Sequence, residues 1–287
     1  MSELPVIDTL WNYQFPNETE NKFRELLLNE KVQQNTVYKQ ELLTQLARTL
    51  GLQRKFEEGL QILDTLKDEL AIENSTVYIR YLLERGRLLN SSRNITEAFK
   101  LFEQAWQFGV TNDEEYYAID ALHMMAIAAP SNEKLKWQNE GIKLAETTKD
   151  PRGKKWLGSL YNNTAWNYHD DLKDYPKAME IFKKTLDWQL ANGNENSIGI
   201  AKWCIARCHR SLNEIDIALE KQQALLVEKG GVDKTGYIYE EIGESLLLLD
   251  HIADSQPYFK KAHDLLSQDT WLATNQKERL LRLKELC

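Results

Sequence analysis

The sequence predicts an all-α fold: a superhelical α-solenoid of about six helix pairs with a capping helix at each end. Three observations predict it. A pattern of small and large apolar residues recurs at a nearly constant interval, and apolar residues within each copy follow the spacing of a helix. Helix breakers are also scarce, with Gly 13 and Pro 6 among 287 residues, which argues against an all-β chain rich in turns.

The repeated pattern is a small residue, a second small residue twelve positions later, and a large apolar residue four positions after that. It is clearest at Gly86, Ala98 and Phe102, and one copy has an extra residue, between Ala165 and Ala178. The six copies, starting from Ala47, are 37 to 41 residues apart, as in two-helix repeats. A small side chain lets the first helix of a pair (helix A) approach the second (helix B). We therefore expect these residues to be buried: Gly86, Ala126, Ala165, Ala206 and Gly243.

The repeats resemble the tetratricopeptide repeat (TPR) family, in a long-period form typical of bacterial TPR proteins. The resemblance is closest in GRLLNSSRNITEAFKLFEQA and in YNNTAWNYHDDLKDYPKAMEIFKKTL. It covers about residues 38–270. The chain is thus divided into an N-terminal extension with a capping helix (1–37), six TPR-like repeats (38–270) and a C-terminal capping helix (271–287).

The chain departs from the family pattern in three respects. Its period exceeds the 34 residues of the family, and a longer helix B and following turn would accommodate the difference. Gln222 stands where a large apolar residue is usual. Pro257 would cost about 3 kcal/mol in mid-helix. We therefore expect a late-starting helix, capped by Asp254 or Ser255, with Pro257 in its first turn.

The sequence also predicts particular helix ends. A capping box at Asn17 and Glu20 opens the first helix, and residues 2–16 are expected to be extended and packed against it. The first helix of the fourth pair should include residues 162–168, with Pro176 at the start of the second. The last helix is amphipathic, with a basic outer face, and its apolar residues are Leu280, Leu281 and Leu283. Altogether fourteen helices are expected.

Composition excludes several classes of function. The net charge of −8 disfavours a nucleic-acid-binding protein, which needs a basic face. The sequence contains no run of about 18 apolar residues, so it predicts no membrane span. The first residues do not resemble a secretory signal. Cys204, Cys208 and Cys287 are too few for a disulfide framework, so a cytoplasmic location is expected.

Few residues suggest catalysis or metal binding. Cys204, Cys208 and His209 lie one turn apart on a predicted helix, but structural zinc needs four ligands, and Cys208 is expected to face the core. Nucleotide-binding and hydrolase motifs are missing from the sequence, so no enzyme activity, metal or cofactor is predicted. The remaining polar clusters have structural interpretations. His169, Asp170 and Asp171 belong to a turn, Gly230 and Gly231 to a helix stop, and Glu240, Glu241 and Glu244 to a solvated helix face.

The inner face of the solenoid is the candidate binding site, because helix A of each pair lines it. Two tryptophans, Trp166 and Trp203, occupy matching inward positions of adjacent repeats and would form an apolar floor beside arginines. Alternatively, each arginine pairs with an acid, such as Glu84, and each tryptophan fills the seam between repeats. The predicted groove residues are Arg80, Arg87, Asn162, Asn163, Trp166, Trp203, Arg207 and Arg210.

The TPR resemblance implies protein–protein interaction, and two functions fit it. The first is a non-catalytic adaptor or scaffold that binds a peptide or protein segment in this groove. Arginines bind carboxylates in a bidentate way, so an acidic or C-terminal carboxylate motif is a candidate ligand. The second is a ligand-sensing or peptide-sensing regulator that acts through a partner. The roughly 37 residues before the first repeat are too few for a helix-turn-helix of the kind such regulators often carry. The last helix, ending at Cys287, could cap the solenoid or dimerise.

Overall fold

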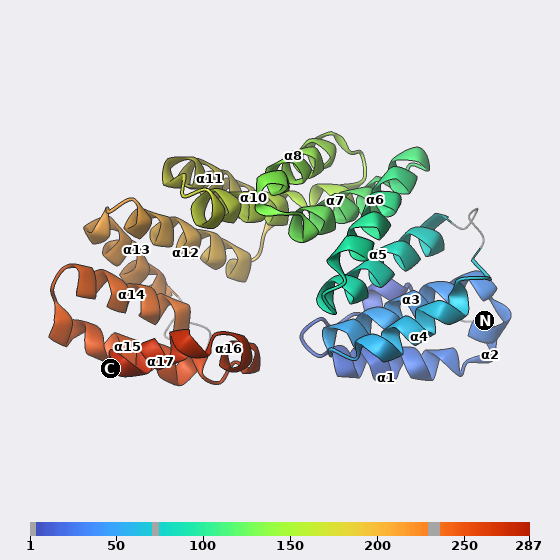
Figure 1. The fold of residues 1–287 in the computed structure, drawn as a ribbon, viewed down its shortest axis with the longest axis horizontal. Helices are drawn as coiled ribbons and strands as arrows, with labels where there is room; N and C mark the ends of the chain where they lie inside the picture. The colour runs from blue at the N-terminus through green and yellow to red at the C-terminus, as the bar shows by residue number, and fades with distance from the viewer. Residues whose placement is uncertain (1–3, 71–74, 229–235) are drawn as a thin grey trace. The chain divides into compact units, whose positions relative to one another are not determined.

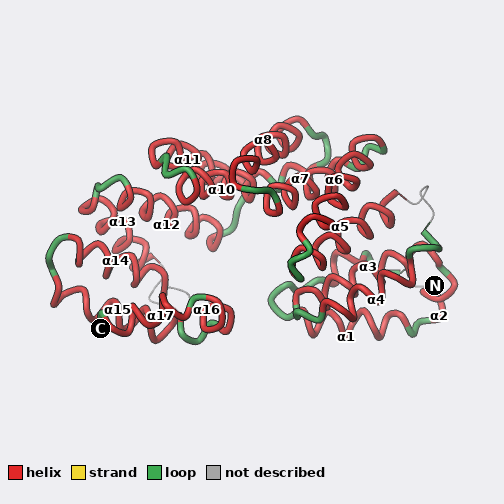
Figure 2. Tube along the Cα trace, in the orientation of Figure 1, coloured by secondary structure: helices red, strands yellow, loops and turns green. Residues whose placement is uncertain are grey.

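The computed structural model describes residues 4–70, 75–228 and 236–287, so the predicted helix stop at Gly230 and Gly231 lies outside the described residues. The described chain contains helices and loops, with no strand (Figure 2). It divides into two compact units, 1–160 and 161–287. The predicted division at residues 37 and 270 stays a prediction.

Unit 1 contains three helix pairs and its own cap. The pairs are α3 (Thr36–Leu52) with α4 (Phe56–Leu66), α5 (Ser75–Ser91) with α6 (Ile95–Thr111), and α7 (Glu115–Ala128) with α8 (Ser131–Thr147). The remaining elements are η1 (Ile7–Leu10), α1 (Pro16–Leu27), α2 (Glu30–Gln34) and α9 (Pro151–Lys154). Within each pair the two helices are in contact, α3 and α5 also contact the next A helix, and α1 packs on α3 (Figure 1).

Unit 2 contains the other three pairs and the C-terminal helices. The boundary between the units falls within α10 (Leu157–Trp166), whose residues from 161 onward belong to unit 2. α10 continues into a π-helical turn, η2 (Asn167–Asp171). Its partner is α11 (Tyr175–Asn192). The next pairs are α12 (Glu195–Ser211) with α13 (Ile215–Glu228), and α14 (Gly236–Leu248) with α15 (Ile252–Leu266). The cap consists of α16 (Thr270–Asn275) and α17 (Lys277–Glu285), and α17 packs on α15. The six predicted pairs are confirmed. The expected total of fourteen helices is wrong, because short helices such as α2, α9 and α16 add to it.

The small residues of the repeat lie where the two helices of a pair meet, as predicted. All of the five predicted residues are buried, with Ala165 fully inaccessible and Ala126 only 5% exposed. A Cβ atom added to Gly86 would lie 2.4 Å from Cε1 of Phe102, and one added to Gly243 would lie 3.0 Å from the Phe259 ring. Real Cβ atoms essentially never approach as closely as at Gly86, and the approach at Gly243 is closer than nearly all real ones. The small residue therefore sets the spacing between helix A and helix B.

The turns from helix A to helix B share one backbone geometry. In five of the six pairs a non-glycine residue has positive φ, for example Arg54 with φ 63° and Arg93 with φ 70°. The next residue then donates its amide to a carbonyl of the last helical turn, as from Asn94 to Leu89 over 2.8 Å. This left-handed C-cap ends helix A and reverses the chain.

The fourth repeat accommodates its extra residue in the π-helical turn of η2. Its closing amide, of Asp174, donates to the carbonyl of Tyr168, six residues earlier, over 2.9 Å. The corresponding bond in the second pair spans five residues. A π-helical turn inserts one residue into a helix without changing the packing on either side of it. Pro176 is the second residue of α11, which confirms the predicted start of that helix.

Two predicted helix starts, that of the first helix and that of the helix containing Pro257, are wrong. α1 begins at Pro16, so Asn17 is not its cap; Glu20 instead accepts hydrogen bonds from Arg24, Gln53 and Lys55. A proline at the first helical position needs no amide partner, which moves the start ahead of Asn17. α15 begins at Ile252, which places Pro257 inside the helix. The buried face formed by Phe259, Ala262 and Leu266 holds the helix together across the proline.

The C-terminal helix has a different orientation from that predicted. Leu283 is fully buried and Leu280 is partly buried, but Leu281 is 58% exposed. Lys277, Arg282 and Lys284 are exposed, as the predicted basic outer face requires, although Arg282 pairs with Glu244 of α14; Arg279 instead pairs with the buried Glu240. The helix is thus joined to unit 2 through both apolar contacts and ion pairs.

Gln222, the departure from the TPR pattern in α13, is fully buried, and neither polar atom of its amide has a hydrogen-bond partner among the described residues. A buried amide without partners destabilises a fold. We expect Gln222→Leu to raise the free energy of unfolding by about 1–3 kcal/mol, measured by urea denaturation. The matched control is Gln223→Leu, at an exposed position next to it, with an expected change within about 0.5 kcal/mol. A loss of stability in Gln222→Leu would show that the amide has a stabilising role.

Candidate functional site

The candidate site is a pocket of about 410 Å³ in unit 2. Its walls come from the A helices α10, α12 and α14, with one residue from the turn η2 and one from the C-terminal helix α17. The lining residues are Trp166, Asp170, Trp203, Arg207, Arg210, Glu240, Glu241 and Arg279. Trp166, Trp203, Arg207 and Arg210 were predicted from their inward positions on helix A.

Three aromatic rings, one from each A helix, form a row, and the first two line the pocket. The ring centroids of Trp166 and Trp203 are 5.9 Å apart, and those of Trp203 and Tyr237 are 6.0 Å apart. Trp203 is held in place by a hydrogen bond from its indole nitrogen to the carbonyl of Tyr237, and the Arg279 guanidinium lies 5.1 Å from the centroid of the Tyr237 ring. The two tryptophans stay partly exposed, so an apolar group can still pack against them.

The arginines of the pocket are held by buried carboxylates. Glu241 accepts from Nε of Arg210 over 2.8 Å and pairs with Nε of Arg207 over 3.0 Å. Burial raises the pKa of Glu241 above its ordinary value, and the two guanidinium groups oppose that rise. Glu240 accepts from Arg279 over 2.8 Å. Because Glu240 and Glu241 are buried and paired, their predicted solvated face is wrong.

Exposure within these ion pairs is unequal. The side chains of Glu240 and Glu241 are 8% and 6% exposed. The side chains of their partners are more exposed: 33% for Arg279, 24% for Arg207 and 17% for Arg210. The carboxylates therefore lie beneath the guanidinium groups. Although the charges balance, the groups that a ligand would meet first in this part of the pocket are positive.

Asp170 lines one edge of the pocket, and the His169 ring contacts it. The His169 ring nitrogens lie 2.6 Å from Oδ1 of Asp170 and 2.8 Å from Oγ of Ser211, and Arg207 donates to the same Ser211 oxygen. Burial lowers the pKa of His169. The neutral ring has one donor and one acceptor nitrogen. When its Nε2 accepts from the Ser211 hydroxyl, its Nδ1 donates to the Asp170 carboxylate. The cluster thus gives Arg207 a second hydrogen-bond partner besides Glu241.

The cysteines have structural positions. Cys204 and Cys208 are buried in the core of unit 2, where burial raises the pKa of Cys204 to about 12 and that of Cys208 to about 11. Both thiols are therefore protonated at neutral pH. Among the described residues, no group of three or more histidine, cysteine or acidic side chains is placed to hold a metal ion.

The other four predicted groove residues do not line this pocket. Asn162 accepts a hydrogen bond from the Cys204 thiol, and Asn163 is not part of the lining. Arg80 and Arg87 belong to unit 1, where both are bound by carboxylates. Arg80 pairs with Asp8 and Glu41, and Arg87 pairs with Glu84 and Asp120. The alternative assignment of arginines to ion pairs with neighbouring acids holds for these two, and also for Arg207 and Arg210, which pair with Glu241 while lining the pocket.

Four lining residues were missed as site residues. Asp170 was assigned to a turn, Glu240 and Glu241 to a solvated face, and Arg279 to the outer face of the last helix. The opposite charges of the arginines on α12 and the acids on α14 could have indicated that these acids belong to the site.

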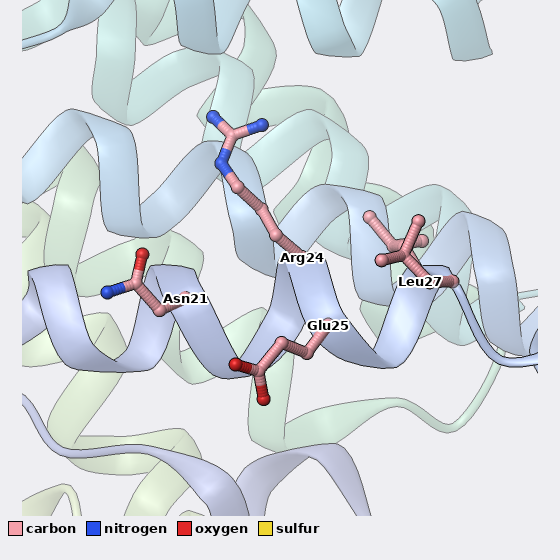
Figure 3. Close-up of a pocket in the computed structure, with 5 residues that line it drawn as sticks. Asn21, Arg24, Glu25 and Leu27 are labelled. Carbon is pink, nitrogen blue, oxygen red and sulfur yellow. The ribbon is translucent and has the colours of Figure 1, made fainter.

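A second, shallower pocket lies on α1 in unit 1, lined by Asn21, Arg24, Glu25, Leu27 and Leu28. Figure 3 shows Arg24 and Glu25 pointing to opposite sides of the helix. Arg24 is already paired with Glu20 and Glu58, and no aromatic ring lines the pocket. The pocket in unit 2 is therefore the stronger candidate.

Comparison with protein-family models finds no match, and none of the curated proteins matches the chain. Solved structures do. The apo form of RapI is 15% identical, covers 96% of this chain and 81% of its own, and has a TM-score of 0.69. Aspartyl phosphate phosphatase F from Bacillus subtilis is 13% identical, covers 98% and 84%, and has a TM-score of 0.58. A tetratricopeptide repeat protein from Parabacteroides merdae is 17% identical, covers 98% and 96%, and has a TM-score of 0.55.

These similarities establish the class of fold. The chain is an all-α, TPR-like solenoid of helix pairs, as its repeats predict. None of the described helices combines the length and the apolar character needed to cross a membrane.

Proposed function

We propose that this chain is a non-catalytic repeat protein that binds a peptide, or a segment of another protein, in the pocket of unit 2. The observation that carries the proposal is the row of Trp166, Trp203 and Tyr237 beside guanidinium groups that lie above their carboxylate partners. Tryptophan and arginine provide most of the binding energy in protein interfaces. The three cysteines are free, which fits action in the cytoplasm.

The unequal exposure of the ion pairs supports an acidic ligand, or one with a C-terminal carboxylate. A ligand carboxylate at Arg207 or Arg210 would share a guanidinium group with Glu241 and need not break the existing pair. Asp170, whose side chain is 61% exposed, is the acidic exception at the rim. The ligand's apolar group would pack on the tryptophans, with its carboxylate on the arginine side.

A ligand-sensing regulator that acts through a partner is the second candidate. The observation that favours it lies in unit 1, where a segment of the chain itself covers the inner surface of the A helices. The likeness to RapI and to aspartyl phosphate phosphatase F extends over nearly the whole chain, and at 13–15% identity it supports only the fold.

The adaptor proposal is tested with a display library of random peptides that end in a free carboxylate. We expect the full chain to select peptides that bind Trp203→Ala at least about 30-fold more weakly, because a central aromatic anchor contributes 2 kcal/mol or more. Arg207→Ala is expected to weaken the same peptides about 10- to 100-fold, by loss of a charge-assisted hydrogen bond. Affinities are measured by fluorescence polarisation on variants whose circular dichroism matches the wild type.

Matched controls lie outside the pocket. Trp271 is 54% exposed on α16, and Arg282 is half exposed on α17, so Trp271→Ala and Arg282→Ala should bind the selected peptides as the wild type does. An equal loss of peptide affinity in Trp203→Ala and Trp271→Ala would contradict the pocket as the binding site. A library that yields no binder would contradict peptide binding itself.

A further inference from the structure

The inner surface of unit 1 is covered by a segment of the chain, residues 4–15, which lies across the A helices α3 and α5. Tyr38 of α3 donates its hydroxyl to the carbonyl of Pro5 over 2.8 Å, and the indole of Trp11 donates to Gln45 of α3 over 3.1 Å. Arg80 of α5 holds Asp8. The sequence predicted an extended segment packed on the first helix. Trp11 does contact Phe23 of α1, but the segment contains the 3₁₀ turn η1 and reaches α5 as well.

The contact between Asp8 and Arg80 resembles recognition of a ligand carboxylate. One guanidinium nitrogen of Arg80 donates to both carboxylate oxygens, over 2.7 and 2.8 Å. The Arg80 side chain is 6% exposed, whereas that of Asp8 is 48% exposed. Arg80 also pairs with Glu41 over 3.3 Å and donates to the Tyr117 hydroxyl over 2.8 Å. Arg80 would therefore keep partners if Asp8 left.

The segment is attached through one side. Ile7 is almost fully buried, and Leu4, Leu10 and Trp11 pack against the same apolar cluster, with the Trp11 ring edge-on to Phe23 at 5.5 Å between centroids. Tyr13 stacks on Trp11 at 4.6 Å, yet it is 64% exposed, and Val6 is 66% exposed. A strand in the core of a domain would be covered on both sides. This segment has one covered side and one side in solvent, as a bound peptide has.

We propose that residues 4–15 are a displaceable internal ligand, and that the surface around Arg80 and Gln45 binds a competing segment of another protein. The segment's own contacts define the competitor's chemistry: an aspartate or glutamate, an apolar residue just before it, and an aromatic residue three positions after it. Tethering gives the internal segment an effective concentration on the order of a millimolar, so a competitor must offset it by a higher affinity or a higher concentration. This surface lies within unit 1 and is independent of the pocket proposed in unit 2.

The test uses a fluorescently labelled synthetic peptide, LPVIDTLWNYQF, that copies residues 4–15, added to the full chain. The double variant Asp8→Asn/Trp11→Ala weakens the internal segment and leaves Arg80 and Gln45 in place. We expect it to bind the peptide at least about tenfold more tightly than the wild type, because one charge-assisted bond and one aromatic contact no longer compete. A peptide with asparagine in place of its aspartate should bind the double variant about tenfold more weakly. Val6→Ala, at an exposed position of the same segment, should behave as the wild type.

Several results would overturn the proposal. One is a folded double variant that does not bind the peptide, and another is equal affinity for the aspartate and asparagine peptides. Unfolding of the double variant would assign residues 4–15 to the core and would equally refute the proposal. Peptide binding that is lost in Trp203→Ala would locate the peptide in unit 2, which would refute this proposal and leave the one for unit 2 standing.

Discussion

Replacing Glu241 with alanine is expected to destabilise the protein by about 3 kcal/mol, as measured by urea denaturation. The Glu241 side chain is 6% exposed and is bonded to both Arg207 and Arg210. Its loss leaves two largely covered guanidinium groups without their carboxylate. Removing one partner of a buried ion pair costs far more than the pair contributes, because the remaining charge is left without compensation.

The control for this prediction is Glu244→Ala, one turn along the same helix. Glu244 pairs with Arg282, whose side chain is 51% exposed, so water replaces the lost partner and the expected cost is below about 1 kcal/mol. Similar losses in the two variants would show that the covered guanidinium groups are compensated in another way. Because Glu241 variants change the stability of the fold, peptide binding in unit 2 is tested with Trp203 and Arg207 variants instead.

Substituting leucine for Gly86 is expected to cost about 3 kcal/mol, even though leucine favours helix formation over glycine by nearly 1 kcal/mol. The added Cβ alone would lie 2.4 Å from the Phe102 ring, and Phe102 is fully buried, so neither side chain can move aside. The helices α5 and α6 would have to separate. Thermal and urea denaturation measure the loss.

Gln104→Leu provides the comparison. Gln104 lies at an exposed position of α6, so the same added side chain meets solvent, and the expected change is within about 0.5 kcal/mol. If Gly86→Leu unfolds at the same urea concentration as the wild type, the small residue does not set the spacing between the helices of a pair.

Periodicity in the sequence was sufficient to predict the pairs and their contact faces. Gly86, Ala165 and Gly243 could be placed between helix A and helix B because a helix turns by a constant angle per residue. The same reasoning placed Trp166, Trp203, Arg207 and Arg210 on one inward stripe, and all four line one pocket. Even the extra residue of the fourth repeat was visible as a change in spacing, although its π-helical form was not.

Only the tertiary structure decided which charges meet. Arg80 binds Asp8, 72 residues away, and Arg279 binds Glu240, 39 residues away. A helical pattern assigns a side chain to a face, but an ion pair depends on the distance between side chains of different elements, which local spacing does not encode. The sequence by itself therefore determined a TPR-like solenoid with an aromatic and basic inner stripe. The tertiary structure decided that its arginines in unit 2 lie over buried glutamates, and that those in unit 1 are already bound, because burial and pairing arise only when separate elements pack together.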